Sequence, residues 1–448
     1  MKMGRRGQRG GRWSVAATGW RIPVTRRLNA STARSGSSIF SIELWLLGVA
    51  SVTLLTAHLL SLAHAPQMDF QVYRLGSRQV LGNALYASKV TLLGQHLFFT
   101  YPPFAAALFW PFSLLPPLVA QGIWDVVDVL ALTALIAVSI AAAHTRRLVR
   151  SDWRTALILV GPFGYLLVPV YSSLLLGQVD LLLVLMIATD LTIGVKWRGR
   201  SLPRGVLVGL ASAVKLTPLL FIPYLLLTGQ RRAARTAALT FLGATATLFA
   251  ASPSASWGYF TKYSHQIKRI GDPVNLGNQS LYAALLRLHL HLPGLLDDLI
   301  IALTCCVGIA VSVVAYRRSS ALLAMLVCAA TGLLVSPFSW GHHYVWVVPL
   351  LVWLSIGADR PAKALWWIAA ALVVFVAVPY TSTGSHGVWS QIRGDCYVIP
   401  ALAFIVLVGM MLWIRSRRTS QIVAGPVHDG PRSVATPPGD WDDVDRGH

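Results

Sequence analysis

The sequence is poor in charged residues, and acidic residues are the scarcest of them. Asp and Glu number 17 against 38 Lys and Arg, so the net charge is +21, and only 12% of the 448 residues are charged. Globular domains average about 25% charged residues. Because 55% of the residues are hydrophobic and the mean hydropathy is +0.60, soluble globular, disordered and nucleic-acid-binding proteins are excluded. The composition indicates a polytopic helical membrane protein.

Cysteine is also scarce. Three of the four cysteines, Cys305, Cys306 and Cys328, lie in apolar runs, and Cys396 stands apart from them. Their spacing fits neither a zinc site nor a disulfide framework. We therefore interpret them as small buried hydrophobic residues.

Apolar segments make up most of the chain, and no long soluble domain or internal repeat interrupts them. Their lengths predict an all-α fold with about twelve transmembrane helices. Several of the segments are short or broken by proline. They span approximately residues 39–62, 102–118, 120–143, 155–175, 179–195, 204–227, 234–251, 295–315, 320–336, 344–357, 364–380 and 397–414.

The basic residues predict that both termini are cytoplasmic. Residues 1–38 carry nine Lys or Arg and no acid, which by the positive-inside rule places a disordered basic arm in the cytoplasm. An even number of spans returns residues 416–448, also expected to be disordered, to the same side. The membrane domain would then be 39–415, with the loops 63–101, 252–294 and 337–343 on the outer face.

Two basic clusters, at residues 146–154 and 196–200, would lie on the outer face and so disagree with this topology. Either these loops break the positive-inside rule, or the segments 102–118 and 204–227 are re-entrant. Prolines within both segments, at Pro111 and Pro218 among others, are consistent with the second explanation.

The first outer loop contains a single carboxylate, Asp69, which stands beside Phe70 and close to Tyr73. A lone carboxylate just beyond the membrane surface can act as a general base toward a sugar hydroxyl. The alternative is a helix cap. Tyr101 precedes two prolines that suit the start of the next helix.

Two polar groups interrupt apolar segments further along the chain. Gln178 lies in a stretch that also contains Asp180, and its amide can bond a ligand or a neighbouring helix. Lys215 lies inside the segment 204–227, just before Pro218. An ammonium there faces a cavity or an anion, unless it snorkels to the membrane surface.

The loop 252–294 contains the amides Asn278 and Gln279, followed by Arg287. Amides suit hydroxyl-rich ligands such as sugars. Turn chemistry is the alternative explanation for Asn278, which follows a glycine.

The loop 337–343 contains His342 and His343, flanked by Trp340 and Tyr344. Paired histidines can bind phosphate or shape a site, and because adjacent residues alternate in direction, we expect only one of them to face inward. A metal site would need more converging ligands than the sequence shows.

One acid surrounded by cations and amides suits transfer of a sugar from a lipid-phosphate donor. The leaving phosphate already carries negative charge, and Lys215, Arg74, Arg287 or His343 would stabilise it. A retaining mechanism would need a second carboxylate as nucleophile, and the sequence shows no good candidate. We therefore predict inversion at the sugar.

Six short motifs in this order resemble glycosyltransferase family 87, which comprises actinobacterial membrane enzymes of the GT-C superfamily that use polyprenyl-phosphate sugars. The resemblance covers about residues 40–415, and the order of the motifs is more specific than any one of them. The motifs are Asp69-Phe-x-Val-Tyr73, Tyr101-Pro-Pro103, Gly177-Gln178, Lys215-Leu-Thr-Pro218, Asn278-Gln-Ser280 and Ser336-Pro-x-Ser-Trp-x-His-His343.

The resemblance implies a GT-C fold in the plasma membrane, with an outer-face active site and Asp69 as the catalytic acidic residue. It implies transfer of mannose from polyprenyl-phosphate-mannose to the 2-hydroxyl of a mannose on a phosphatidylinositol mannoside, from a β-linked donor to an α-linked product. Both lipids are thus the expected partners, and we expect no cofactor and no metal. We assign donor binding to Lys215, His342, His343, Arg287, Arg74 and Gln178, and acceptor binding to Tyr73, Tyr101, Asn278, Gln279 and Trp340.

The sequence leaves the donor sugar and the acceptor open. Members of the same family suggest α-1,2 branching of lipomannan or lipoarabinomannan, or arabinofuranose transfer from decaprenyl-phosphate arabinose. A transporter of lipid-linked glycans would also need intramembrane charge and broken helices. The lack of paired halves, together with polar motifs gathered on one face, argues against a transporter.

Overall fold

The computed structural model describes residues 67–423 except residues 83, 93, 146, 289–293 and 378–393, and it adds four positions of the first apolar segment, Gly48, Val49, Thr53 and Thr56. The predicted basic arm, most of the first span and the end of the tail lie outside the described residues. The chain that is described is mainly α-helical, with two short antiparallel hairpins, β1–β2 and β3–β4.

The elements follow one another in this order: α2 (Met68–Ser77), β1 (Lys89–Leu92), β2 (Gln95–Phe98), α3 (Pro103–Ser113), α4 (Pro117–Ala143), α5 (Arg150–Leu166), α6 (Val168–Leu176), α7 (Asp180–Leu191), β3 (Lys196–Trp197), β4 (Arg200–Ser201), α8 (Val206–Val214), η1 (Thr217–Leu220), α9 (Phe221–Leu227), α10 (Arg231–Ala251), α11 (Pro253–Thr261), η2 (Tyr263–His265), η3 (Ile267–Arg269), α12 (Leu281–Arg287), α13 (Gly294–Arg318), α14 (Ala321–Val335), η4 (Gly341–Trp346), α15 (Val347–Ile356), α16 (Ala364–Leu372), η5 (Val373–Ala377) and α18 (Val398–Val423).

Four described helices are long and apolar enough to cross a membrane: α4, α10, α13 and the part of α18 from Val398 to Arg418. A fifth crossing is possible if α5 and α6, which are bent by 84° at the break between them, are counted as one span. These helices are compatible with a polytopic membrane protein. The total of about twelve spans and the GT-C topology stay predictions. α18 continues to Val423, so the tail expected to be disordered from residue 416 begins as helix.

The two proline-containing segments suspected of re-entry are short or broken. α3 has 11 residues, and at 1.5 Å per residue it is roughly 16 Å long, against about 30 Å of hydrocarbon. The segment 204–227 is divided into α8, η1 and α9, with Lys215 at the first break. Pro218 lies within η1, where a regular helix would lose a backbone hydrogen bond.

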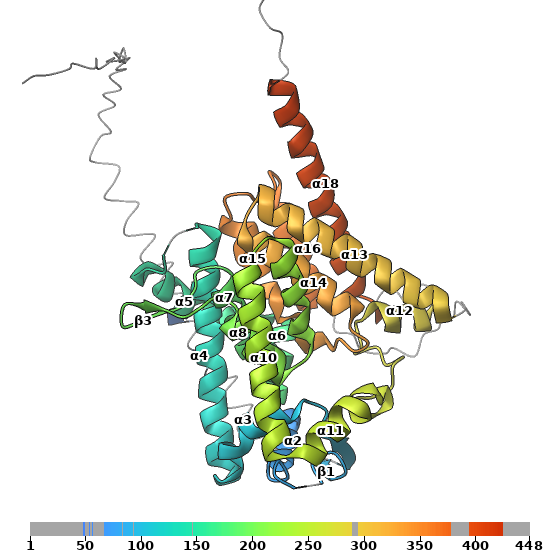
Figure 1. The fold of residues 1–448 in the computed structure, drawn as a ribbon. Helices are drawn as coiled ribbons and strands as arrows, with labels where there is room; N and C mark the ends of the chain where they lie inside the picture. The colour runs from blue at the N-terminus through green and yellow to red at the C-terminus, as the bar shows by residue number, and fades with distance from the viewer. Residues whose placement is uncertain are drawn as a thin grey trace, which may run out of the picture. The chain divides into compact units, whose positions relative to one another are not determined.

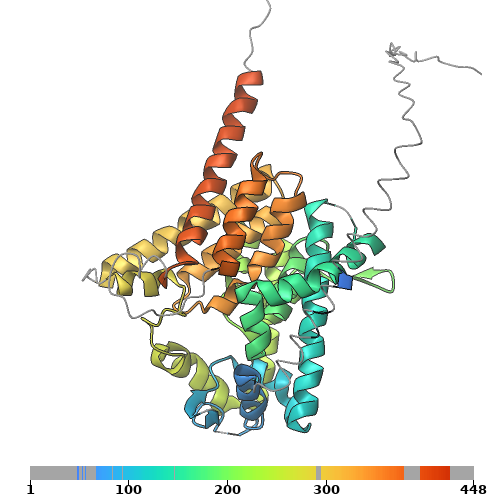
Figure 2. The same cartoon turned by 180° about the vertical axis from the view of Figure 1, so that it is seen from behind.

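Two of the predicted outer loops contact each other. Tyr86, from the loop 63–101, stacks on Tyr259 and Tyr263, from the loop 252–294, with ring centroids 5.5 and 5.0 Å apart. The Arg269 guanidinium donates a hydrogen bond to the Tyr86 carbonyl. Figures 1 and 2 show α2, β1 and α11 gathered at one end of the helices, where α4 begins and α10 ends. The two loops therefore belong to one face.

A glycine turn between α6 and α7 supports the short helix α2 at this face. Gly177 has a left-handed φ of 68°, and a Cβ there would lie 2.6 Å from the Cβ of Phe70. The Phe70 ring stacks on Trp124, whose Nε1 donates a 3.1 Å hydrogen bond to the Gly177 carbonyl. α2 can pack this closely on the turn only because residue 177 has no side chain.

We predict that Gly177→Ala displaces α2 and destabilises the protein. The substitution combines an unfavourable φ with steric overlap, which together cost about 1–3 kcal/mol. The unfolding midpoint in detergent should fall. Gly122→Ala is the matched control, because a Cβ at Gly122 meets nothing within 4 Å. A midpoint for Gly177→Ala equal to that of the control would contradict this account of the turn.

Candidate active site

Asp69 lies in the first turn of α2 and is half-buried. Its Oδ2 accepts a 2.5 Å hydrogen bond from Nε2 of Gln178. The cap position of α2 belongs to Gln67, and no side-chain cap bond forms there. The helix-cap alternative for Asp69 is therefore not what the structure shows, and its carboxylate points to the α6–α7 turn instead.

Two tyrosines fix the orientation of the Gln178 amide. The hydroxyls of Tyr73 and Tyr101 lie 2.6 and 3.1 Å from Oε1 of Gln178 and 2.8 Å from each other. Because the amide oxygen accepts from these hydroxyls, the amide nitrogen is left to donate to Asp69. Gln178, Tyr73 and Tyr101 therefore position the carboxylate, whereas the sequence assigned them to donor and acceptor binding.

The environment of Asp69 raises the pKa of its carboxyl group to about 6. Burial is the largest cause, the Asp180 charge adds to it, and the Gln178 hydrogen bond and the Lys215 charge oppose it. A carboxyl group with this pKa is mostly ionised near neutral pH and is a stronger base than an exposed aspartate.

Lys215 occupies the break between α8 and η1 and is held by Asp180, the first residue of α7. Its Nζ lies 2.7 Å from Oδ1 of Asp180 and 5.5 Å from the centroid of the Tyr101 ring. The side chain is only 13% exposed, so Lys215 is paired inside the protein and does not snorkel. Tyr101 thus connects the surroundings of Asp69 with the Lys215–Asp180 pair.

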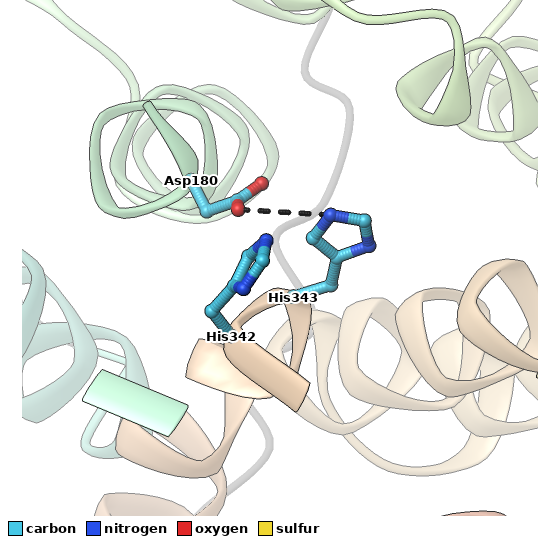
Figure 3. A group of neighbouring side chains, drawn as sticks. All are labelled: Asp180, His342 and His343. Carbon is cyan, nitrogen blue, oxygen red and sulfur yellow. Dashed lines mark ion pairs between the residues drawn. The ribbon is translucent and has the colours of Figure 1, made fainter. Parts of the chain in front are cut away.

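His342 and His343 lie in η4, across from α7, and both are buried. Nε2 of His343 is 4.0 Å from Oδ2 of Asp180. Figure 3 shows both imidazole rings on the side of the Asp180 carboxylate. The expectation that only one would face inward is wrong, because adjacent residues in this 3-10 turn do not alternate as they do in a strand.

Asp180 is the functional candidate that the sequence assignment left out. One potential ligand atom each from Asp180, His342 and His343 lies within 4.8 Å of the other two, although the sequence gave no sign of converging ligands. A carboxylate two residues after Gln178, inside an apolar stretch, was the available signal. Asp180, Lys215, Thr217, His343 and Trp346 are among the residues that line a cavity of about 50 Å³.

The two arginines assigned to the donor have protein partners. Arg74 donates to the carbonyls of Phe112 and Leu115, at 3.1 and 2.5 Å. Arg287 forms a buried ion pair with Asp395 and also donates to the Asn278 carbonyl at 2.9 Å. Both guanidiniums hold loops together, and we leave them out of the proposed donor site.

Asn278, Gln279 and Trp340 belong to the same loop framework as Arg287. Oδ1 of Asn278 accepts from the backbone N–H of Ser339 at 3.0 Å, and Asn278 forms an isolated β-bridge with Trp340. Oε1 of Gln279 accepts from the backbone N–H of Tyr397 at 3.0 Å. The Asn278 amide connects the loop 252–294 to the loop 337–343, and the Gln279 amide connects it to the residues just before α18. These protein contacts differ from the acceptor contacts that the sequence predicted.

The half-buried carboxylate of raised pKa lies close to a buried ammonium and two imidazoles, and these groups suit the transfer of a group from an anionic leaving group. The comparisons give the family of the chain. A family model described as glycosyltransferase family 87 matches residues 99–337, and the chain belongs to this family. It is a glycosyltransferase.

The chain is similar to several mycobacterial proteins. The chain is 33% identical, over 90% of its own length and 96% of the relative's, to the polyprenol-phosphate-mannose-dependent α-(1-2)-phosphatidylinositol mannoside mannosyltransferase of Mycobacterium tuberculosis. The protein of the same description from Mycolicibacterium smegmatis is 34% identical over 77% of this chain and 84% of its own.

A second type of relative is described as a phosphatidylinositol pentamannoside mannosyltransferase. The one from Mycobacterium tuberculosis is 32% identical over 68% of this chain and 72% of its own. No solved structure is significantly similar to the chain.

We predict that Arg287 acts on stability and not on the donor. Arg287→Met leaves the Asp395 carboxylate buried without its partner, which costs about 3–5 kcal/mol. The double variant Arg287→Met/Asp395→Leu should recover part of the loss in thermal unfolding and keep the wild-type KM for the donor. A raised donor KM in the stable double variant would return Arg287 to the donor site.

Proposed function

We propose that this chain is an inverting α-1,2-mannosyltransferase that transfers mannose from polyprenol-phosphate-mannose to a phosphatidylinositol mannoside at the outer face of the membrane. The relatives that share 96% and 84% of their length with this chain carry that description. The relative whose description names the pentamannoside is matched over a smaller share of its length, 72%. This difference favours the acceptor named in the first two descriptions over a longer glycan. The mannose in these descriptions favours a mannose donor over an arabinose donor.

The observation that carries the mechanism is the hydrogen-bonded carboxylate of Asp69. In the proposed step, Asp69 takes the proton from the 2-hydroxyl of the acceptor mannose while that oxygen attacks C1 of the donor mannose. The bond between C1 and the phosphate oxygen breaks, and the polyprenyl phosphate leaves with the electron pair. Asp180, the other carboxylate of this network, is ion-paired with Lys215 through Oδ1, so we assign it to the charge balance of the donor site and not to the nucleophile of a retaining mechanism.

The departing phosphate gains negative charge, and the cavity of about 50 Å³ is lined by groups that can stabilise this charge. Lys215 supplies a fixed positive charge, and His343 lines the same cavity. Charge developing in a buried site is stabilised strongly by such preorganised groups. We place the donor phosphate at this cavity, with the Asp69 carboxylate on the acceptor side.

A series of apolar cavities fits the lipid tail of the donor. The cavity of about 50 Å³ that Lys215 and His343 line shares the lining residues Leu333 and Trp346 with an apolar cavity of about 70 Å³. That cavity in turn shares Leu350, Phe375 and Phe404 with one of about 430 Å³ between α15, α16 and α18. We propose that the polyprenyl chain lies along the two larger cavities. Their walls are apolar or aromatic, and they adjoin the proposed position of the phosphate.

The membrane orientation completes the proposal. We place α2, β1 and α11 on the outer face and both termini in the cytoplasm. The contacts between the loops 63–101 and 252–294 support a common face for the acidic loop and its neighbour. No soluble donor is then required, because both substrates are membrane lipids.

We predict that Asp69→Asn abolishes most of the mannose transfer while the fold is kept. Loss of a general base typically slows a reaction by ~10²–10⁴-fold. The assay uses purified protein in detergent with polyprenyl-phosphate-mannose and a phosphatidylinositol tetramannoside. Asp298→Asn, an exposed acid on α13, is the matched control. Turnover of Asp69→Asn close to that of the control would eliminate Asp69 as the base.

We predict a pH profile that reports this base. Only ionised Asp69 accepts a proton, so kcat/KM should fall as the pH drops through about 6, where burial places the pKa of this carboxyl group. Gln178→Leu removes a hydrogen bond that stabilises the carboxylate, so the inflection should move to higher pH. The protein must be shown to stay folded at low pH. A Gln178→Leu inflection at or below that of the wild type would refute the positioning role.

A further inference from the structure

Two buried polar atoms in the site have no hydrogen-bond partner in the described part of the chain. Oδ2 of Asp180 and Nε2 of His342 make no hydrogen bond there, and both residues are only 6% exposed. A buried polar group without a partner carries a desolvation penalty. Because the two atoms belong to one cluster with His343 (Figure 3), a single bound species could satisfy both.

The chemistry of the three side chains restricts what that species can be. A phosphate oxygen placed among them would meet the Asp180 carboxylate and be repelled. A cation accepts lone pairs from the carboxylate and from both imidazoles together. Two imidazoles with one carboxylate form a ligand set that zinc and other divalent transition metals use, whereas magnesium and calcium prefer oxygen ligands alone.

We propose that Asp180, His342 and His343 bind one divalent transition-metal ion. Their candidate ligand atoms lie within 4.8 Å of one another. Ligands about 2.1 Å from a shared ion are roughly 3–3.5 Å apart, so side-chain shifts of about 1 Å would close the site. Three protein ligands leave at least one coordination position open.

Lys215 is compatible with such an ion because it uses the other carboxylate oxygen. Its Nζ contacts Oδ1 of Asp180 at 2.7 Å, and Oδ2 stays available. The ammonium and the ion would nevertheless repel each other. Lys215 should therefore weaken metal binding when the donor is absent, which gives the site a signature that a purely structural cluster lacks.

The charge of the leaving group gives the ion a purpose, and this step rests on the proposed function. Asp180 and Lys215 together have no net charge, whereas a phosphate monoester carries about −1.5 to −2 near neutral pH. A divalent ion beside Lys215 would balance that charge in a buried site. Its open position would face the donor phosphate at the cavity that Asp180 and His343 line.

The test is direct metal binding to the purified full-length protein, carrying an affinity tag without histidine. After treatment with a chelator and desalting, Mn²⁺ and Zn²⁺ are titrated separately by calorimetry, and bound metal is measured by elemental analysis. We expect one equivalent of ion per chain. Asp180→Asn and His342→Gln should each weaken binding by at least about 100-fold, since even partners of metal ligands contribute 10–100-fold.

Three further variants separate loss of a ligand from loss of the fold. His144→Ala removes an exposed histidine at the end of α4 and should bind like the wild type. Asp180→Glu keeps a carboxylate and should retain part of the affinity. Lys215→Gln should bind the ion more tightly than the wild type. Unfolding midpoints measured beside each titration show which variants are folded.

The outcomes also separate this proposal from the proposed function. Failure of the folded wild type to bind either ion stoichiometrically, or unchanged affinity in folded Asp180→Asn, would overturn the metal site. Full mannose transfer by metal-free protein in chelator would overturn the ion's role at the donor phosphate and leave the mannosyltransferase intact. Stoichiometric binding in a protein that transfers no mannose would support the metal site and count against the function.

Discussion

The hydrogen bond from Gln178 to Asp69 is the contact on which the site depends. It joins the ten-residue helix α2 to the turn between α6 and α7. That turn is possible because Gly177 has a left-handed conformation and no Cβ to collide with Phe70. Tyr73 and Tyr101 then fix the amide, so the direction of the Asp69 carboxylate follows from packing and not from the carboxylate itself. Small changes in the turn should therefore act on the chemistry.

Lys215 and Asp180 form a buried ion pair between apolar segments of the chain. A buried ion pair adds little net stability, because the desolvation of both groups offsets much of their attraction. Its retention in an apolar segment is therefore better explained by function than by folding. Lys215 lies between the end of α8 and the start of η1. The interruption of the helix therefore coincides with the position from which the ammonium contacts Asp180.

The sequence was most informative where a polar residue stood out against an apolar background. Gln178 and Lys215 stand out in this way, whereas Asp69 is the single carboxylate of its loop and His343 is one of two adjacent histidines. The structure brings all four into one connected region. Arg287 was misassigned because its partner, Asp395, is 108 positions away and no local pattern connects the two. Asp180 is absent from the sequence assignment, although this carboxylate lies in the same apolar stretch as Gln178. Proline marks both breaks: Pro218 follows the break between α8 and η1, and Pro169, the second residue of α6, follows the 84° bend between α5 and α6.

The central claim is that Asp69 activates the acceptor for a single direct displacement at C1 of the donor sugar. The anomeric configuration of the product tests this most directly. The product is made from a β-linked polyprenyl-phosphate-mannose and analysed by NMR for the configuration and linkage of the new mannose. Direct displacement should give an α-mannose on the 2-hydroxyl, with the configuration inverted. A β-linked product would mean retention through a covalent intermediate, and would contradict a site with one free carboxylate.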